Sequence, residues 1–67
     1  MTLAEFIKSK GITVKLLSQE MKISKQAIFK WGNKYMPTAK SLKRISNALN
    51  NLGVETSPVE IFTALQK

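Results

Sequence analysis

Helix-start signals recur along this chain at intervals of about ten to twenty residues, and they restrict the fold more than any other feature. At five positions a Thr or Ser suits the helix N-cap, where a side-chain oxygen accepts a hydrogen bond from an unpaired backbone N–H group. These positions are Thr2, Thr13, Ser24, Thr38 and Ser57. The intervals leave room only for short helices, so we predict an all-α fold with five helices.

Further cap and terminator residues set the helix limits. Glu5 and Glu60 each stand three residues after an N-cap, which predicts a capping box at the first and fifth helices. Gly11 and Gly53 suit helix ends, and Pro58 suits a first helical position. The predicted helices run from Thr2 to Gly11, Thr13 to about Lys22, Ser24 to Asn33, Thr38 to Gly53 and Val59 to about Gln66.

Apolar residues recur at helical spacing, which gives the predicted helices a buried face. In the first, second and fourth helices this face consists of Leu3, Phe6, Ile7, Val14, Leu17, Ser18, Met21, Leu42, Ile45, Ala48, Leu49 and Leu52. In the third helix, Ile28 and Trp31 point toward the core. The other side of that helix carries Lys25, Gln26, Phe29, Lys30 and Asn33.

The carboxyl-terminal segment allows two interpretations. Val59 and Ile61 are β-branched, so a strand from Val59 to Phe62 remains an alternative to the fifth helix. The segment is also more apolar than one short helix requires, because it contains Val54, Val59, Phe62 and Leu65. The excess serves either to close the core or to form a dimer surface.

Charge gives the first indication of function. Eleven Lys and Arg residues against four Glu produce a net charge of +7. Residues 1–44 hold ten basic and two acidic residues, or +8, whereas residues 45–67 hold one Lys and two Glu, or −1. Solvated surface lysines account for part of such an excess, but an uneven charge of this size is expected where the partner is a polyanion. Nucleic acid is the leading candidate.

Length and composition argue against several other classes. A chain of 67 residues is expected to form a single domain, residues 1–67, with little room for a deep cleft. It contains no His, Cys or Asp, so we expect no catalytic residues, no metal site and no cofactor. No secretory leader and no apolar run of about 20 residues is present, which predicts a cytoplasmic protein without a membrane partner.

Residues 14–33 form a unit of two predicted helices joined by a tight turn, with small or apolar residues where crossing helices make contact. These residues are Leu17, Ser18, Met21, Ile23, Ile28 and Trp31. The runs Leu17–Met21 and Ile23–Ile28 resemble the helix-turn-helix of the phage Cro and lambda-type repressor family. Trp31 with Pro37 shortly after it is similar to some small Cro proteins.

This resemblance extends from about Leu3 to Leu65 and implies a five-helix, lambda-repressor-like DNA-binding domain. Two residues depart from the family pattern. Lys22 stands in the turn where the family usually has Gly, and a non-glycine residue with positive φ costs about 1 to 2 kcal/mol. Val14 stands where the family often has a Gln that binds a phosphate.

In a helix-turn-helix the second helix enters the major groove, so its first residues and its outer face reach the base edges. The predicted base-reading residues are therefore Ser24, Lys25, Gln26, Phe29, Lys30 and Asn33. Gln26 suits a bidentate pair with adenine, and Lys25 or Lys30 suits guanine. Phe29 either packs on a thymine methyl or belongs to the core or a dimer contact.

Phosphate contacts are expected from other basic and capping residues. At the amino end of the fourth helix, free backbone N–H groups and the positive end of the helix dipole combine with Lys40. The predicted phosphate-binding residues are Lys15, Lys34, Thr38, Lys40, Lys43 and Arg44. Such contacts position the protein without reading sequence.

The family resemblance implies a Cro-like repressor, of phage or plasmid type, that reads an operator in double-stranded DNA. It also implies a homodimer at least on DNA, because one copy offers little surface for tight specific binding. The alternative function is a protein-interaction module on the same scaffold, such as an antirepressor or antitoxin. Binding that weakens steeply with salt would favour DNA.

Overall fold

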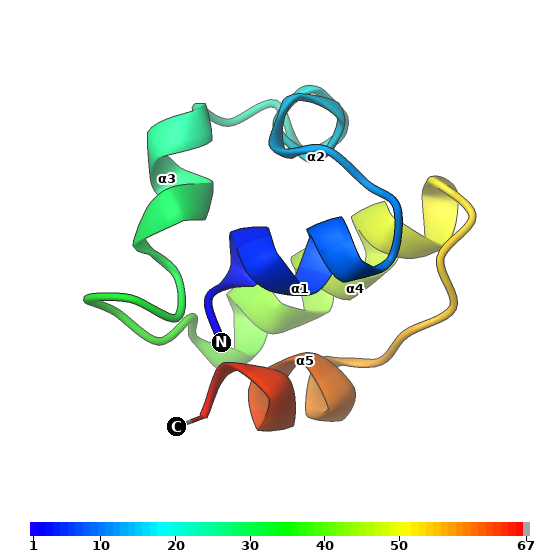
Figure 1. The fold of residues 1–67 in the computed structure, drawn as a ribbon. Coiled ribbons are helices and arrows are strands. Elements are labelled where there is room, and N and C mark those ends of the chain that lie inside the picture. Colours follow the sequence, from blue (N-terminus) through cyan, green and yellow to red (C-terminus); the bar gives the residue numbers. More distant parts are fainter. Residues whose placement is uncertain (67) are drawn as a thin grey trace.

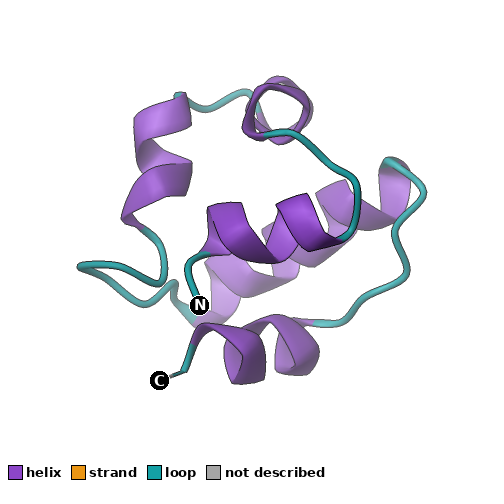
Figure 2. Cartoon of the chain, in the orientation of Figure 1, coloured by secondary structure: helices purple, strands orange, loops and turns teal. Residues whose placement is uncertain are grey.

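Five short α-helices are present in a computed structural model, which describes residues 1–66 (Figure 1). They are α1 (Leu3–Ser9), α2 (Val14–Met21), α3 (Lys25–Lys30), α4 (Ala39–Asn51) and α5 (Pro58–Leu65). Loops and turns join them, with no strand in the described residues (Figure 2), so the all-α fold class is confirmed. None of the helices within residues 1–66 has the length and hydropathy needed to cross a membrane.

All five predicted N-cap residues cap their helices. The side-chain oxygens of Thr2, Thr13, Ser24, Thr38 and Ser57 accept hydrogen bonds from backbone N–H groups three residues later, at 3.1–3.3 Å. At α1 the predicted capping box is complete, because the Thr2 N–H group donates to Glu5 Oε1 at 2.9 Å. That bond favours the charged carboxylate and lowers the pKa of Glu5.

The capping box predicted at α5 is only half formed. Ser57 Oγ accepts the hydrogen bond from the Glu60 N–H group, but the Glu60 carboxylate accepts one from the Thr56 hydroxyl at 2.8 Å. The Thr56 hydroxyl thus takes the place that the Ser57 N–H group would have as donor to Glu60 in a complete capping box. The helix begins at Pro58, one residue before the start of the predicted range, and Pro58 takes the first helical position as expected.

One hydrophobic core joins all five helices. Its fully buried side chains are Leu3, Ile7, Leu17, Ile28, Ile45, Leu49, Ile61 and Leu65. α4 packs against α2 and α5, and α1 packs against α2, α3 and α5. In Figure 1, α3 lies at one side of the molecule and is supported by α1 and α2. This support leaves the opposite face of α3 open.

The carboxyl-terminal segment is helical, so the alternative of a strand is wrong. A helix brings Ile61 and Leu65, four residues apart, onto one buried face. Val54 also packs against the core. Val59 and Phe62 do not help to close the core, because they are 73% and 40% exposed.

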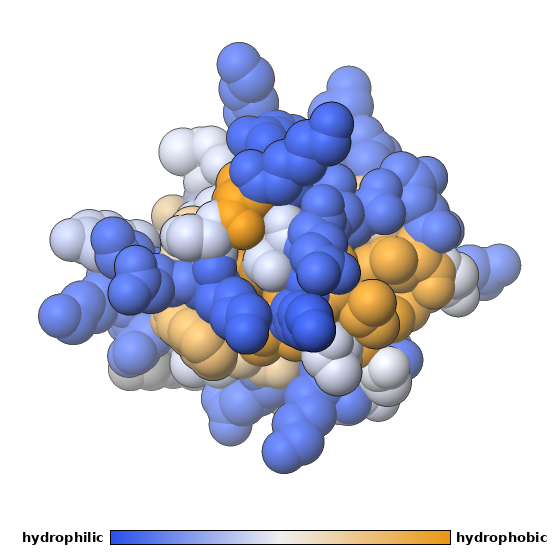
Figure 3. Space-filling view, turned by 90° about the horizontal axis from the view of Figure 1, so that it is seen from above, coloured by the Kyte–Doolittle hydropathy of each residue, from blue (hydrophilic) through white to orange (hydrophobic). Residues whose placement is uncertain are grey.

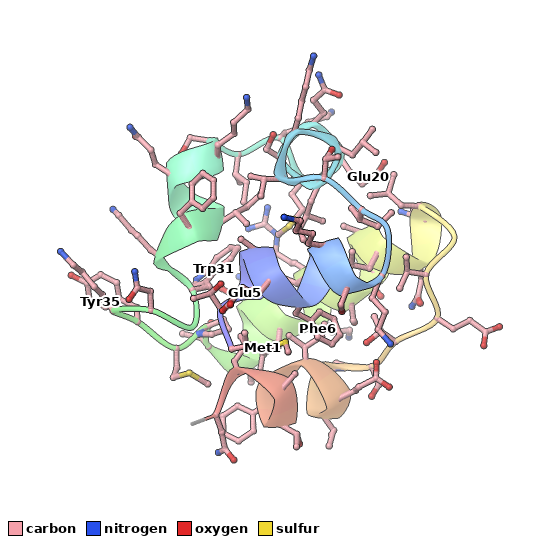
Figure 4. All side chains as sticks on the ribbon, in the orientation of Figure 1. Met1, Glu5, Phe6, Glu20, Trp31 and Tyr35 are labelled. Carbon is pink, nitrogen blue, oxygen red and sulfur yellow. The ribbon has the colours of Figure 1, made fainter. Side chains whose placement is uncertain are left out.

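α3 ends at Lys30, three residues before the predicted end at Asn33. Trp31 packs against the core, as predicted, but its side chain is only half-buried. Its backbone is extended rather than helical, and its carbonyl accepts a hydrogen bond from the Leu3 N–H group at 3.0 Å. This bond to α1 takes the place of another helical turn. Asn33 therefore lies in the α3–α4 loop; Figure 4 shows Trp31 near the start of α1 and Tyr35 pointing outward from that loop.

Gly32 occupies a crowded crossing of three chain segments. A Cβ atom here would lie 2.9 Å from Leu65 Cδ2, 2.9 Å from Thr2 Cα and 3.0 Å from the Met1 carbonyl oxygen. Gly11 has the same φ of +82° but nothing within 4 Å of the corresponding position. A comparison of alanine substitutions at the two glycines therefore separates the free-energy cost of a positive φ from the cost of steric crowding.

We expect Gly11→Ala to lower the free energy of unfolding by about 1 kcal/mol, because a side chain disfavours positive φ. Gly32→Ala should cost a further ~1 to 3 kcal/mol, because the backbone of residues 1 and 2 must move to admit the methyl group. Denaturant unfolding of both variants measures the difference. Equal losses of stability would contradict the crowded crossing.

Candidate nucleic-acid interface

The turn between α2 and α3 is closed by backbone hydrogen bonds around Lys22. As the sequence predicts for this turn, Lys22 adopts the left-handed conformation, with φ 58° and ψ 43°. Its N–H group donates to the Gln19 carbonyl at 3.3 Å, and the Ile23 N–H group donates to the Ser18 carbonyl at 3.0 Å. These bonds fix the direction in which α3 leaves α2.

α3 has the buried and exposed faces that the sequence predicts. Ile28 is fully buried, and α2 supports it with the buried side chains of Leu17 and Met21. The exposed residues at the start and on the outer face of α3 are Ser24, Lys25, Gln26, Phe29 and Lys30. Ser24 Oγ already accepts the Ala27 N–H group at 3.3 Å, so its remaining donor is the hydroxyl hydrogen.

Phe29 is outside the core. Its side chain is 51% exposed, which removes the core alternative and leaves a DNA or dimer contact. On one side it lines an apolar hollow with Ala4, Ile12 and Val14, between α1 and the start of α2. On the other side it adjoins the polar face of α3. The ring therefore marks the border between an apolar and a basic part of the surface.

Asn33 lies beside the outer face of α3 although it is not part of that helix. Asn33 and Lys34 of the loop line one shallow hollow together with Gln26, Phe29 and Lys30 of α3. The structure thus brings five predicted site residues into one surface region. α3 ends early and Gly32 has a positive φ, yet Asn33 and Lys34 still lie beside the outer face.

The predicted phosphate-binding residues are distributed over three segments. Lys15 is exposed in the first turn of α2, and Lys34 is exposed in the α3–α4 loop. Thr38 caps α4 by accepting the Ser41 N–H group at 3.2 Å, and the free N–H groups of the first turn follow it. Exposed basic side chains in the first half of α4 are Lys40, Lys43 and Arg44.

The face formed by α2 and α3 is largely hydrophilic. Figure 3 looks onto it from above and shows hydrophilic side chains over most of the surface, with an apolar area at the right. Lysines of this region include Lys15, Lys22, Lys25 and Lys30, all exposed. Within residues 1–66, no group of three or more His, Cys, Asp or Glu residues is placed to hold a metal ion. The chemistry of the face suits an extended polyanion.

A model of the helix-turn-helix family HTH_3 matches residues 3–55, which contain α1 to α4. The chain belongs to this helix-turn-helix family. Members are DNA-binding regulatory domains rather than typical enzymes, and the five observed helices are compatible with a lambda-repressor-like domain. The match confirms the predicted general family, whereas similarity to phage Cro itself stays a prediction. No significant match is found among curated proteins or among solved structures.

The sequence interpretation assigned no role to Tyr35 and Met36. They are 61% and 43% exposed in the α3–α4 loop, next to the exposed Phe62 of α5. The sequence signal was present, because an aromatic residue and a methionine between Lys34 and Pro37 are unusual in a loop expected to be polar. The hollow that they line is also lined by Asn33 and Lys34, so it adjoins the outer face of α3.

The left-handed turn residue gives a direct test of the motif geometry. Lys22→Gly should raise the free energy of unfolding by a few tenths to about 1 kcal/mol, since glycine adopts positive φ without a Cβ clash. Lys22→Ala is the matched control: it also removes the exposed amine but keeps the Cβ atom, so it should bring no gain. A lower melting temperature for Lys22→Gly would contradict the strained turn.

Proposed function

We propose that the protein is a sequence-specific, double-stranded-DNA-binding transcriptional regulator, a cytoplasmic Cro-like repressor that occupies an operator. The observation that carries the proposal is the exposed outer face of α3, the second helix of a helix-turn-helix, with Lys25, Gln26 and Lys30 free of the core. Such a helix enters the major groove of B-DNA with its outer face toward the base edges. The net charge of +8 on residues 1–44 supports a polyanionic partner.

In this proposal base recognition comes from α3 and the residues beside it. The side-chain amide of Gln26 pairs with adenine by donating from its nitrogen and accepting at its oxygen, and Lys25 or Lys30 donates to guanine. Ser24 donates its hydroxyl hydrogen, which the helix-cap hydrogen bond leaves free. The aromatic ring of Phe29 packs on a thymine methyl at the edge of the contact. Asn33 reaches the DNA from the loop.

The phosphate contacts come from the first turn of α2, the α3–α4 loop and α4. At the start of α4, unpaired N–H groups, the helix dipole and Lys40 act on the same phosphate. Lys15, Lys34, Thr38, Lys43 and Arg44 supply further contacts. They hold α3 in register and carry no sequence information of their own.

Two variants distinguish a contact that reads the base sequence from a contact that only positions the protein on the phosphate backbone. Gln26→Ala should cost about 1 to 3 kcal/mol at the preferred operator and leave binding to random duplex nearly unchanged, because only base contact is lost. Lys40→Ala should weaken binding to every duplex by a similar factor and reduce the slope of log affinity against log salt by about one unit per lost phosphate contact. Both side chains are exposed, so neither change should affect folding.

Affinity measurements over a range of salt concentrations, on operator and random duplexes, provide both readouts; the operator comes from selection on random duplex DNA. Equal losses on operator and random DNA for Gln26→Ala would contradict its reading role. A changed base preference without a changed salt slope for Lys40→Ala would contradict its positioning role. Failure of the selection to enrich any motif would favour a protein-binding module instead.

The regulator is proposed to bind as a homodimer to a pseudo-palindromic operator. Two α3 helices in successive major grooves lie one turn of duplex apart, about 34 Å. Footprinting should therefore show two half-sites centred about ten base pairs apart. Protection of one unrepeated half-site at saturation would contradict this arrangement.

A further inference from the structure

The apolar hollow between α1 and the start of α2, here called the Val14 hollow, adjoins the proposed DNA-binding face. Its apolar walls are Ala4, Ile12, Val14 and Phe29. Phe29 also lines the shallow hollow on the outer face of α3, where Gln26 lies. One half-exposed aromatic ring thus belongs to both hollows. The Val14 hollow is therefore continuous with the predicted base-reading surface.

The polar residues at the rim of the Val14 hollow are Glu5, Lys8 and Thr13. Two of them already serve helix caps. Glu5 Oε1 accepts a hydrogen bond from the Thr2 N–H group at 2.9 Å, and Thr13 Oγ1 accepts one from the Leu16 N–H group at 3.1 Å. A polar group placed in the hollow would lose its contacts with water and find few partners in exchange. The hollow therefore suits an apolar part of a ligand.

Val14 lies between base-reading and phosphate-binding residues, an argument that rests on the proposed function. It shares a hollow with Phe29, and the next residue of α2 is the exposed Lys15. In the major groove, the C5 atom of a pyrimidine lies on the side of the base nearer to its own phosphate backbone, and in thymine it carries a methyl group. The order from Gln26 through Phe29 and Val14 to Lys15 matches the order of polar base edges, C5-methyl group and phosphate across the groove.

The side chain at position 14 also favours an apolar contact. In the family that the sequence resembles, this position often holds a Gln that binds a phosphate, whereas valine has no hydrogen-bond donor. Val14 packs in part against the core, and the rest of its surface faces the hollow. Any contact that Val14 makes with DNA is therefore with carbon atoms.

We propose that Val14 and Phe29 together bind the C5-methyl group of a pyrimidine, which makes Val14 a specificity-determining residue of the DNA-binding site. The proposed function gives the methyl group one wall, the Phe29 ring, and the Val14 hollow adds the others. Thymine and 5-methylcytosine carry the methyl group at the same ring position, so the site accepts both. Cytosine and uracil lack it and leave the hollow unfilled. Methylation of a cytosine at this operator position therefore strengthens binding.

Base substitutions in the selected operator test the methyl contact with the wild-type protein. Replacing one thymine at a time by deoxyuridine removes only the methyl group. At one or more positions the affinity should fall about fourfold, as expected for one buried methyl group. At such a position, a pair of 5-methylcytosine with guanine should bind more tightly than a pair of cytosine with guanine, by a similar factor. No loss at any thymine would overturn the proposal.

Variants of the protein test the role of Val14. Val14→Thr keeps the shape of the side chain but places a hydroxyl group in the hollow, so the ratio of affinities for the thymine and deoxyuridine duplexes should fall toward one. Leu16→Thr is the matched control, because it places the same side chain at an exposed position of α2 outside the hollow, and the ratio should be unchanged. The ratio compares two duplexes with one protein sample, so a loss of folded protein cancels.

Val14→Ala is a second variant that widens the hollow without adding a polar group, and it should lower the same ratio. An unchanged ratio in both Val14 variants would assign the methyl contact to Phe29 alone and overturn the role of Val14. A protein that selects an operator but does not respond to any thymine methyl group would contradict this inference and leave the proposed function intact. Failure to select any operator would overturn both.

Discussion

A backbone hydrogen bond from the Leu3 N–H group to the Trp31 carbonyl, 3.0 Å long, holds the end of α3 against the start of α1. The next residue, Gly32, passes so close to Thr2 and Leu65 that a side chain fits there only if these neighbours move. α3 has only six residues, and isolated helices shorter than about 12 residues are marginal in water. Its order must therefore come from this junction, from the Lys22 turn and from burial of Ile28. The orientation of the proposed recognition helix depends on all three.

Features encoded within a few residues could be predicted from the sequence. An N-cap hydroxyl and the N–H group three residues later are neighbours in any helix start, so Thr13 or Thr38 identifies a helix without knowledge of the rest of the fold. The same holds for the outer face of α3, because helical spacing places Gln26 and Lys30 away from Ile28. The left-handed conformation of Lys22 could be predicted because the family that the sequence resembles usually has glycine at this turn position.

Features that depend on distant partners could not be predicted in this way. The helix pattern of α3 continues to Asn33, but the helix ends at Lys30. There the Trp31 carbonyl bonds to the N–H group of Leu3, 28 positions earlier in the chain, and Gly32 adopts a positive φ. The exposure of Phe62 was equally hidden, because apolar residues on two sides of α5 do not show which side meets the core. The roles of single site residues toward DNA stay predictions, since exposure makes contact possible without demonstrating it.

The α3–α4 loop joins the proposed DNA-binding face to an exposed apolar area beside α5. Asn33 and Lys34 line one hollow with Gln26 and Lys30 of α3 and a second hollow with Tyr35, Met36 and Phe62. The Gly32 N–H group donates to the Tyr35 carbonyl at 2.8 Å, which links the two halves of the loop. This bond limits the conformations open to Asn33 and Lys34 before DNA arrives, which reduces the entropy lost on binding.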